Sequence, residues 1–286
     1  MNQASNLHQS LNDVDSLPDI PDLARKILSL NLTNDEDVRT LLELIEKDPS
    51  ILPGIISLSN SLLFSSGRKI MKMEDAVISL GSKLILMLAL SISIISSMTR
   101  KPAGLLNIQS LWKHSLAVAM TMETLARSMP QDRRPSDYEI YLAGLLHDIG
   151  FLVLDYLDPQ LSDRFHARLA AEPKYSIEEV EAEMLETDHG ELGAMLGRRW
   201  NLPAPIIASM NYHHAPEVDQ TTVASTLVAL ASLAEKMLPT FGFTESSALK
   251  DIAIEEWQSL GIGSDRMSEI KSKAQKIVLE VTTTKF

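Results

Sequence analysis

The sequence predicts an all-α fold, a helical bundle, and three observations support this prediction. Apolar residues recur at i, i+3, i+4 and i+7 in residues 34–48, and similar stripes follow in 111–129 and 270–281. Ser-x-x-Glu capping boxes at 136–139 and 176–179 mark two helix starts. Alternating apolar patterns joined by Asn-Gly or Asp-Gly turns, which would indicate β-hairpins, are absent from the sequence.

Proline and glycine place the breaks between the expected helices. Residues 102–104 separate an N-terminal bundle from the segment that begins near Ile108. Pro203 and Pro205 open a later helix, because proline is tolerated in the first helical turn. Residues 84–98 are apolar on nearly every side, which predicts a central buried helix.

The composition narrows the class of protein. A chain of 286 residues with 45% hydrophobic residues can build a sizeable core. Lys and Arg number 26 against 38 Asp and Glu, and this net charge of -12 argues against a nucleic-acid-binding surface. Because the chain has no cysteine, any metal must be held by His, Asp or Glu.

Export and membrane insertion are not expected. Residues 1–16 are polar and carry no apolar stretch of signal-peptide type. The longest apolar run, 84–98, is interrupted by serines and falls short of the roughly 20 residues that a membrane span requires. We therefore expect a cytoplasmic protein without a membrane span.

His114 points from the inner face of its expected helix, and four further histidines lie at expected helix ends, where a bundle can present several side chains to one cavity. Together with one aspartate they form the candidate metal ligands: His114, His147, Asp148, His189, His213 and His214. Imidazoles with a carboxylate suit Fe, Mn, Zn or Ni. A single buried histidine is more often a hydrogen-bonded packing residue than a ligand, so spacing alone leaves both interpretations open.

Several ordered motifs resemble a known family. "LWKHSLAVA", "LAGLLHDIG", "DHGELGAMLGRRWNLP" and "HHAP", between Leu111 and Pro216, are similar to the HD superfamily of metal-dependent phosphohydrolases. "LPDIPDLARKIL", "IEKDPSILPGIISLSNSLLF" and "MEDAVISLGSKLILMLAL", between Leu17 and Leu90, resemble the HDOD family, the HD-related output domain of bacterial signalling proteins.

The resemblance implies a domain plan. Residues 1–16 would be a polar tail, and 17–108 an N-terminal HDOD helical subdomain packed on an HD-like helical subdomain at 109–216. Residues 217–286 would add amphipathic helices. The resemblance also implies metal binding at the positions of the candidate ligands above, with one or both of His213 and His214 taking part.

The sequence departs from the catalytic pattern of the superfamily at three places. Ser232 stands where the resemblance places a final metal-binding Asp, and we expect Glu235, one turn later, not to replace it. Phe151 stands where cyclic-dinucleotide phosphodiesterases of the HD-GYP type carry a phosphate-facing Lys. Their Gly-Tyr-Pro segment is missing after His214. Loss of the carboxylate ligand and of the phosphate-facing cation removes positive-charge stabilisation of the phosphoryl oxygens.

Two hypotheses on function follow. The first is a non-catalytic regulatory module of signal transduction, which binds a signalling protein partner or a small, nucleotide-type ligand and retains a remnant metal site. The alternative is a metal-dependent phosphohydrolase or phosphodiesterase acting on a nucleotide or cyclic dinucleotide.

Overall fold

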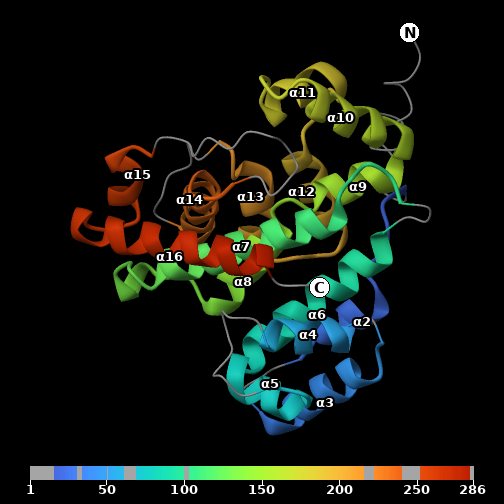
Figure 1. The fold of residues 1–286 in the computed structure, drawn as a ribbon, viewed down its shortest axis with the longest axis vertical. Helices are drawn as coiled ribbons and strands as arrows, with labels where there is room; N and C mark the ends of the chain where they lie inside the picture. Colours follow the sequence, from blue (N-terminus) through green and yellow to red (C-terminus); the bar gives the residue numbers. More distant parts are fainter. Residues whose placement is uncertain are drawn as a thin grey trace. The chain divides into compact units, whose positions relative to one another are not determined.

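The computed structural model describes residues 16–30, 34–49, 51–60, 69–99, 103–215, 222–239 and 252–283. The regular structure within these ranges is helical throughout, which confirms the predicted all-α class (Figure 1). Nearly all of the expected tail at 1–16 lies outside the described residues, as do three stretches of the C-terminal segment, 217–221, 240–251 and 284–286.

The helices follow one another closely along the chain. In order they are α2 (Asp22–Leu28), α3 (Asp35–Glu46), α4 (Ile51–Ser59), α5 (Met73–Leu80), α6 (Ser82–Met98), α7 (Ile108–Ala126), the short 3-10 helix η2 (Gln131–Arg133), α8 (Asp137–Leu146), α9 (Gly150–Leu157), α10 (Pro159–Ala171), α11 (Ile177–Met184), α12 (His189–Arg199), α13 (Ala204–Tyr212), α14 (Val223–Lys236), α15 (Ile254–Ser259) and α16 (Ser264–Thr283).

The chain divides into two compact units. One comprises residues 20–97 and 279–286, and we call it the N-terminal unit. The other comprises residues 1–19 and 98–278, and we call it the site unit because it carries all the candidate metal ligands. Helices α14 and α15, from the expected C-terminal segment, belong to the site unit.

The N-terminal unit is built from α2 to α6 around aliphatic side chains. Ile45, Ile55 and Ile85 are fully buried. Asn60, at the end of α4, joins two separate segments: its amide donates to the carbonyl of Ile70 (2.7 Å) and its Oδ1 accepts the N–H of Ile70 (2.8 Å). These two bonds satisfy both the carbonyl and the N–H of Ile70, in a partly buried setting.

In the site unit, α7 packs against α8 and α14, while α12 packs against α9 and α13. The α7–α8 contact depends on Gly144, because a Cβ built there would lie 2.4 Å from the Cα of Ala119. The close approach of the two helices brings His114 of α7 and His147 at the end of α8 together, with ring centroids 5.4 Å apart. Small residues at the crossing therefore help to position the site.

Helix caps set where the site-bearing helices begin. The predicted capping boxes at Ser136 and Ser176 are both present, at the starts of α8 and α11. The side chain of Asp188 accepts the N–H of Glu191 and so fixes His189 as the first residue of α12.

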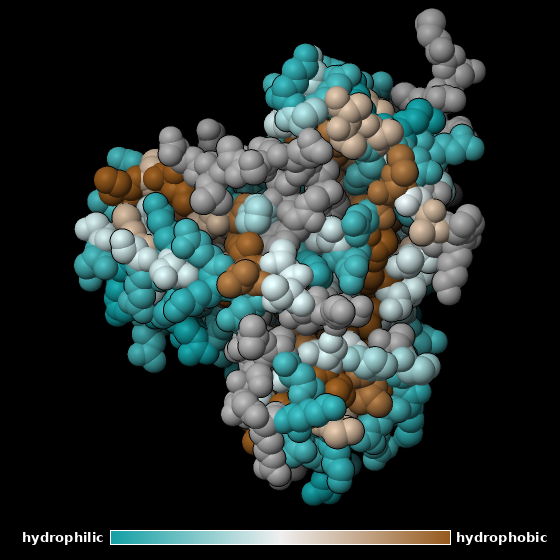
Figure 2. Space-filling view, in the orientation of Figure 1, coloured by the Kyte–Doolittle hydropathy of each residue, from teal (hydrophilic) through white to brown (hydrophobic). Residues whose placement is uncertain are grey.

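One described stretch, Asp137–Leu157, has the length and hydropathy of a membrane span, and 89% of its most apolar window is buried inside the protein. Helices α5 and α6 pass the same test only as a pair, bent by 114°. The stretch at Asp137–Leu157 packs as a core helix does. On the face shown in Figure 2, hydrophilic residues gather over α11, and hydrophilic and apolar residues lie side by side over α10.

Candidate metal centre

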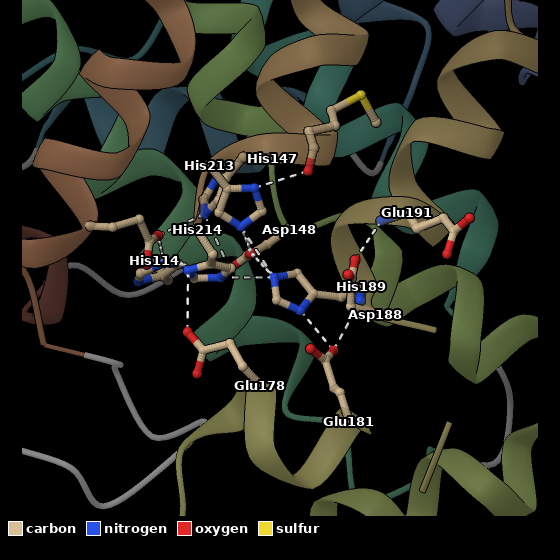
Figure 3. Close-up of polar contacts among 12 residues, drawn as sticks. His114, His147, Asp148, Glu178, Glu181, Asp188, His189, Glu191, His213 and His214 are labelled. Carbon is tan, nitrogen blue, oxygen red and sulfur yellow. Dashed lines mark hydrogen bonds and ion pairs between the residues drawn. The ribbon is translucent and has the colours of Figure 1, made fainter. Parts of the chain in front are cut away.

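The candidate ligands converge in the site unit from five helices (Figure 3). His114 projects from the middle of α7, and His147 and Asp148 form the junction between α8 and α9. His189 opens α12, while His213 and His214 follow α13. All are buried except His214, of which a quarter of the side chain is exposed. The structure thus brings together all six residues singled out in the sequence.

The ligand atoms fall into two overlapping groups. Subsite A consists of His114, His147, Asp148 and Glu235, and subsite B of Asp148, His189, His213 and His214. Within each subsite the ligand atoms lie within 4.8 Å of one another.

Asp148 offers a different oxygen to each subsite. Its Oδ2 lies 3.2 Å from His147 Nε2 and 3.4 Å from His114 Nε2. Its Oδ1 lies 3.4 Å from His189 Nε2 and 3.5 Å from His213 Nε2. One carboxylate therefore serves both groups.

The expectation that Glu235 does not reach the site is wrong. Its Oε1 lies 2.6 Å from His114 Nε2 and 2.8 Å from His147 Nε2. The longer side chain of glutamate reaches in from one turn beyond Ser232, on a helix that packs directly against α7. Subsite A therefore has two carboxylates.

The hydrogen bonds of three rings decide which nitrogen faces the subsites. The Nδ1–H of His147 donates to the carbonyl of Gly144 (2.8 Å), and that of His213 donates to the carbonyl of Met210 (2.9 Å). The Nδ1–H of His189 donates to Glu181 Oε1 (2.7 Å). Because these oxygens only accept, each neutral ring keeps its lone pair on Nε2, which faces a subsite.

The spacing of these nitrogens fits a metal ion. The Nε2 of His189 lies 3.1 Å from the Nε2 atoms of both His213 and His214. A proton on His189 Nε2 makes such a contact a hydrogen bond, whereas without that proton the facing lone pairs repel. Two nitrogens bound to one metal at ~2.0–2.1 Å are about 3.0–3.4 Å apart at octahedral or tetrahedral angles. The donor set therefore suits a divalent cation.

Without a metal the two carboxylates are balanced by protons on the rings. Burial alone would lower the pKa of His189, but Glu181 and Asp148 outweigh it and raise that pKa to about 9. Burial also opposes charge on Asp148 and Glu235, yet neighbouring histidines hold both carboxyl pKa values well below their usual range. Burial and the adjacent His213 and His189 lower the pKa of His214 to about 2. A metal entering this centre would displace protons from the rings.

Glycine at position 150 is required by the closeness of α9 and α12. A Cβ there would lie 1.8 Å from the carbonyl oxygen of His189. The backbone of Gly150 can therefore approach the first residue of α12, which holds His189 beside Asp148. The next residue, Phe151, stacks on the His189 ring with centroids 4.3 Å apart and planes inclined by 15°.

A cavity of about 520 Å³ opens beside subsite B. His189, His213 and His214 line it, together with an acidic set: Glu178, Glu181, Glu186, Asp188 and Glu191. Among the described residues that line the cavity there is no Lys or Arg. Its surroundings favour cations over anions.

Sequence reasoning missed Glu181, which is 1% exposed and contacts His189. The capping box at Ser176 predicts its helix, and Glu178 and Glu181 lie three residues apart, hence on one face. No local pattern says that this face meets histidines from other helices.

An all-helical protein with a buried histidine–carboxylate centre at its helix ends is the class that this fold and site define. The sequence model of the HDOD domain family matches residues 17–216, so the chain belongs to the HDOD family.

Solved structures resemble this chain in fold. A protein from Marinobacter aquaeolei VT8 named for signal transduction superposes with a TM-score of 0.76 and 22% identity, covering 97% of this chain and 63% of its own. One from Shewanella amazonensis SB2B named as a phosphohydrolase superposes with a TM-score of 0.67 and 20% identity, covering 95% and 96%. These likenesses show the fold.

A relative from Treponema pallidum (strain Nichols), named only as an uncharacterized protein, is 25% identical over 234 residues. The match covers 78% of this chain and 44% of the relative, so the chain spans less than half of that protein's length.

Proposed function

We propose that this chain is a metal-holding HDOD signalling module, which binds divalent cations at subsites A and B and acts through a protein partner rather than by phosphoester turnover. The observation that carries metal binding is the convergence of Nε2 lone pairs and two carboxylates, with the ring orientation set by bonds at Nδ1. Fe, Mn, Zn and Ni all suit such ligands.

A bound divalent metal would supply Lewis acidity and lower the pKa of a bound water toward ~7. In subsite A it would be held by His114, His147, Asp148 and Glu235. In subsite B the three histidines would hold it beside Asp148 Oδ1. The buried rings are fixed by backbone carbonyls and by Glu181, so the ligands are oriented before a metal arrives.

Two features of the site oppose turnover of a phosphoester. The cavity beside subsite B is acidic, and Phe151 places an apolar ring where a phosphate-facing cation would be needed. Apart from a bound metal, developing negative charge on phosphoryl oxygens would find carboxylates and no Lys or Arg in the described lining of the cavity. This supports an output through binding.

The second candidate is a metal-dependent phosphohydrolase that acts on a nucleotide-type substrate. One observation favours it: Glu235 returns a carboxylate to subsite A and so offsets the change at Ser232. Two adjacent metals can stabilise both the attacking and the leaving oxygen of a displacement.

The metal content of the purified protein tests whether the chain binds divalent cations. Protein purified without chelator should carry about one or two equivalents of metal by mass spectrometry, and Asp148→Asn should lose most of it, because Asp148 serves both subsites. Asp132→Asn, an exposed residue of η2, makes the same charge change away from the site and should retain the metal. A folded wild type that takes up no Zn²⁺ or Mn²⁺ overturns the proposal.

The same proteins decide between binding and turnover. The metal-loaded wild type should not hydrolyse a panel of nucleotides, cyclic dinucleotides and aryl phosphates. Hydrolysis that disappears in Asp148→Asn and persists in Asp132→Asn would establish the phosphohydrolase instead.

A further inference from the structure

Glu181 is a buried carboxylate that faces the metal centre. It lies on α11, is 1% exposed, and its Oε1 accepts two hydrogen bonds from one residue: the backbone N–H of His189 at 2.9 Å and the ring Nδ1–H of His189 at 2.7 Å. Its other oxygen, Oε2, is buried and has no hydrogen-bond partner among the described residues. The charge of this carboxylate is therefore directed at His189.

Such a pair of bonds fixes both the orientation and the tautomer of the ring. The bond to the backbone holds the carboxylate in place, and the bond to Nδ1 leaves the Nε2 lone pair of His189 facing His213, His214 and Asp148. A carboxylate behind a ligating imidazole also makes the ring a stronger donor.

The two subsites differ in the groups that hold their histidine rings from behind. In subsite A, His147 is held by a backbone carbonyl, that of Gly144. In subsite B, α11 places carboxylates behind two histidines, since Glu178 Oε1 also lies 3.4 Å from His214 Nδ1 (Figure 3). The Glu181–His189 contact is the shorter of the two and is fully buried.

We propose that Glu181 is the positioning residue of subsite B, which orients His189 and sets the affinity of that subsite for a divalent metal. The inference rests on the proposed metal binding. Loss of the Glu181 charge should weaken subsite B about 10–100-fold, the usual effect of removing an outer-shell carboxylate, and leave subsite A unchanged.

The test uses the full chain and Zn²⁺ as the probe. Stepwise zinc affinities are measured by chelator competition for the wild type, Glu181→Gln, Glu181→Ala and Glu183→Gln. Glu183→Gln is the matched control: it makes the same change on the same helix, where Glu183 is about half exposed and pairs with Arg168. Only the Glu181 variants should lose affinity, at one of two sites, and Glu181→Ala more than Glu181→Gln, which keeps an acceptor oxygen.

The outcomes separate the inference from the proposed function. A wild type that binds no zinc refutes the metal-holding proposal itself. A wild type with two zinc sites and a Glu181→Gln variant with both affinities unchanged overturns the role of Glu181 alone, and so does an equal loss in Glu183→Gln.

A spectroscopic measurement tests the same inference without any variant. In zinc-loaded protein with ¹⁵N-labelled histidine, His189 should show a protonated Nδ1 and a metal-bound Nε2. A metal-bound Nδ1 at His189 contradicts the arrangement, whatever the variants do.

Discussion

Replacing Gly150 by alanine should destabilise the protein strongly, because the added methyl group would clash with backbone atoms, which cannot move away as a flexible side chain can. The Cβ would lie 1.8 Å from the carbonyl oxygen and 2.6 Å from the carbonyl carbon of His189. Real Cβ contacts are essentially never below 3.0 Å, so α9 and α12 must separate by about 1.2 Å or more. We expect a loss of at least about 3 kcal/mol, the upper end for overpacked cores.

Gly193→Ala is the matched control for this prediction. Gly193 lies on α12 against the same junction, but its Cβ would meet the nitrogen of Gly150 at 3.4 Å, an ordinary contact. Alanine also favours a helix over glycine by about 1 kcal/mol, so Gly193→Ala should be neutral or stabilising.

Thermal unfolding followed by circular dichroism measures the difference between the two variants. A loss of about 3 kcal/mol corresponds to a fall in Tm of roughly 6–12 °C for a domain of this size. Gly150→Ala should also hold less zinc, because His189 moves away from Asp148. If Gly150→Ala melts within about 2 °C of the wild type, the close approach of α9 and α12 is not what the structure describes.

Three further predictions concern charge in and near the centre. Glu235→Gln should lower the zinc affinity of subsite A while Ser232→Ala, one turn earlier, leaves it unchanged; equal affinities in both variants by chelator competition would contradict the role of Glu235. Because Glu181 and Asp148 raise the pKa of His189 to about 9 against the effect of burial, zinc must displace a proton at neutral pH, so affinity at subsite B should rise about tenfold per pH unit between 7 and 9. Calorimetry across that range that shows a constant affinity would refute this. Burial lowers the pKa of His166 to about 4, below the ~6.5 of an unfolded chain, so its contribution to stability is present above pH 6.5 and falls by up to about 3 kcal/mol as the pH drops to 4. Urea midpoints of His166→Gln should therefore decline less steeply with acid than those of the wild type, and identical slopes would count against it.

Local chemistry made most of the fold and part of the site predictable. The side-chain hydroxyls of Ser136 and Ser176 accept bonds from free backbone amides wherever a helix begins, so their meaning does not depend on the rest of the chain. The position of His147 at a helix end follows from the start at Ser136 and from glycine at 150, and that of His189 follows from the cap at Asp188. A ligand on a helix end can therefore be recognised from its neighbours in the sequence.

The contributions of Glu235 and Glu181 could not be predicted in this way. Each carboxylate comes from a helix that reaches the histidines only through tertiary packing, α14 against α7 in one case and α11 beside the start of α12 in the other. The sequence tells which face of a helix a residue shares, but not which distant helix that face meets. Glu235 was expected not to reach the site, but its side chain is long enough to contact His114.

Phe151 and Glu235 show that two departures from a catalytic pattern have opposite structural consequences. At Glu235 a carboxylate arrives from the next helical turn and subsite A regains its charge. At Phe151 the ring is 2% exposed and stacked on His189, so a cation at this position would be buried within the core. Metal binding needs only oriented donors, whereas phosphoester turnover also needs positive charge beside the phosphoryl oxygens. The described residues offer such donors, and the described lining of the cavity adds carboxylates but no Lys or Arg, so in our proposal a bound metal is the source of positive charge there.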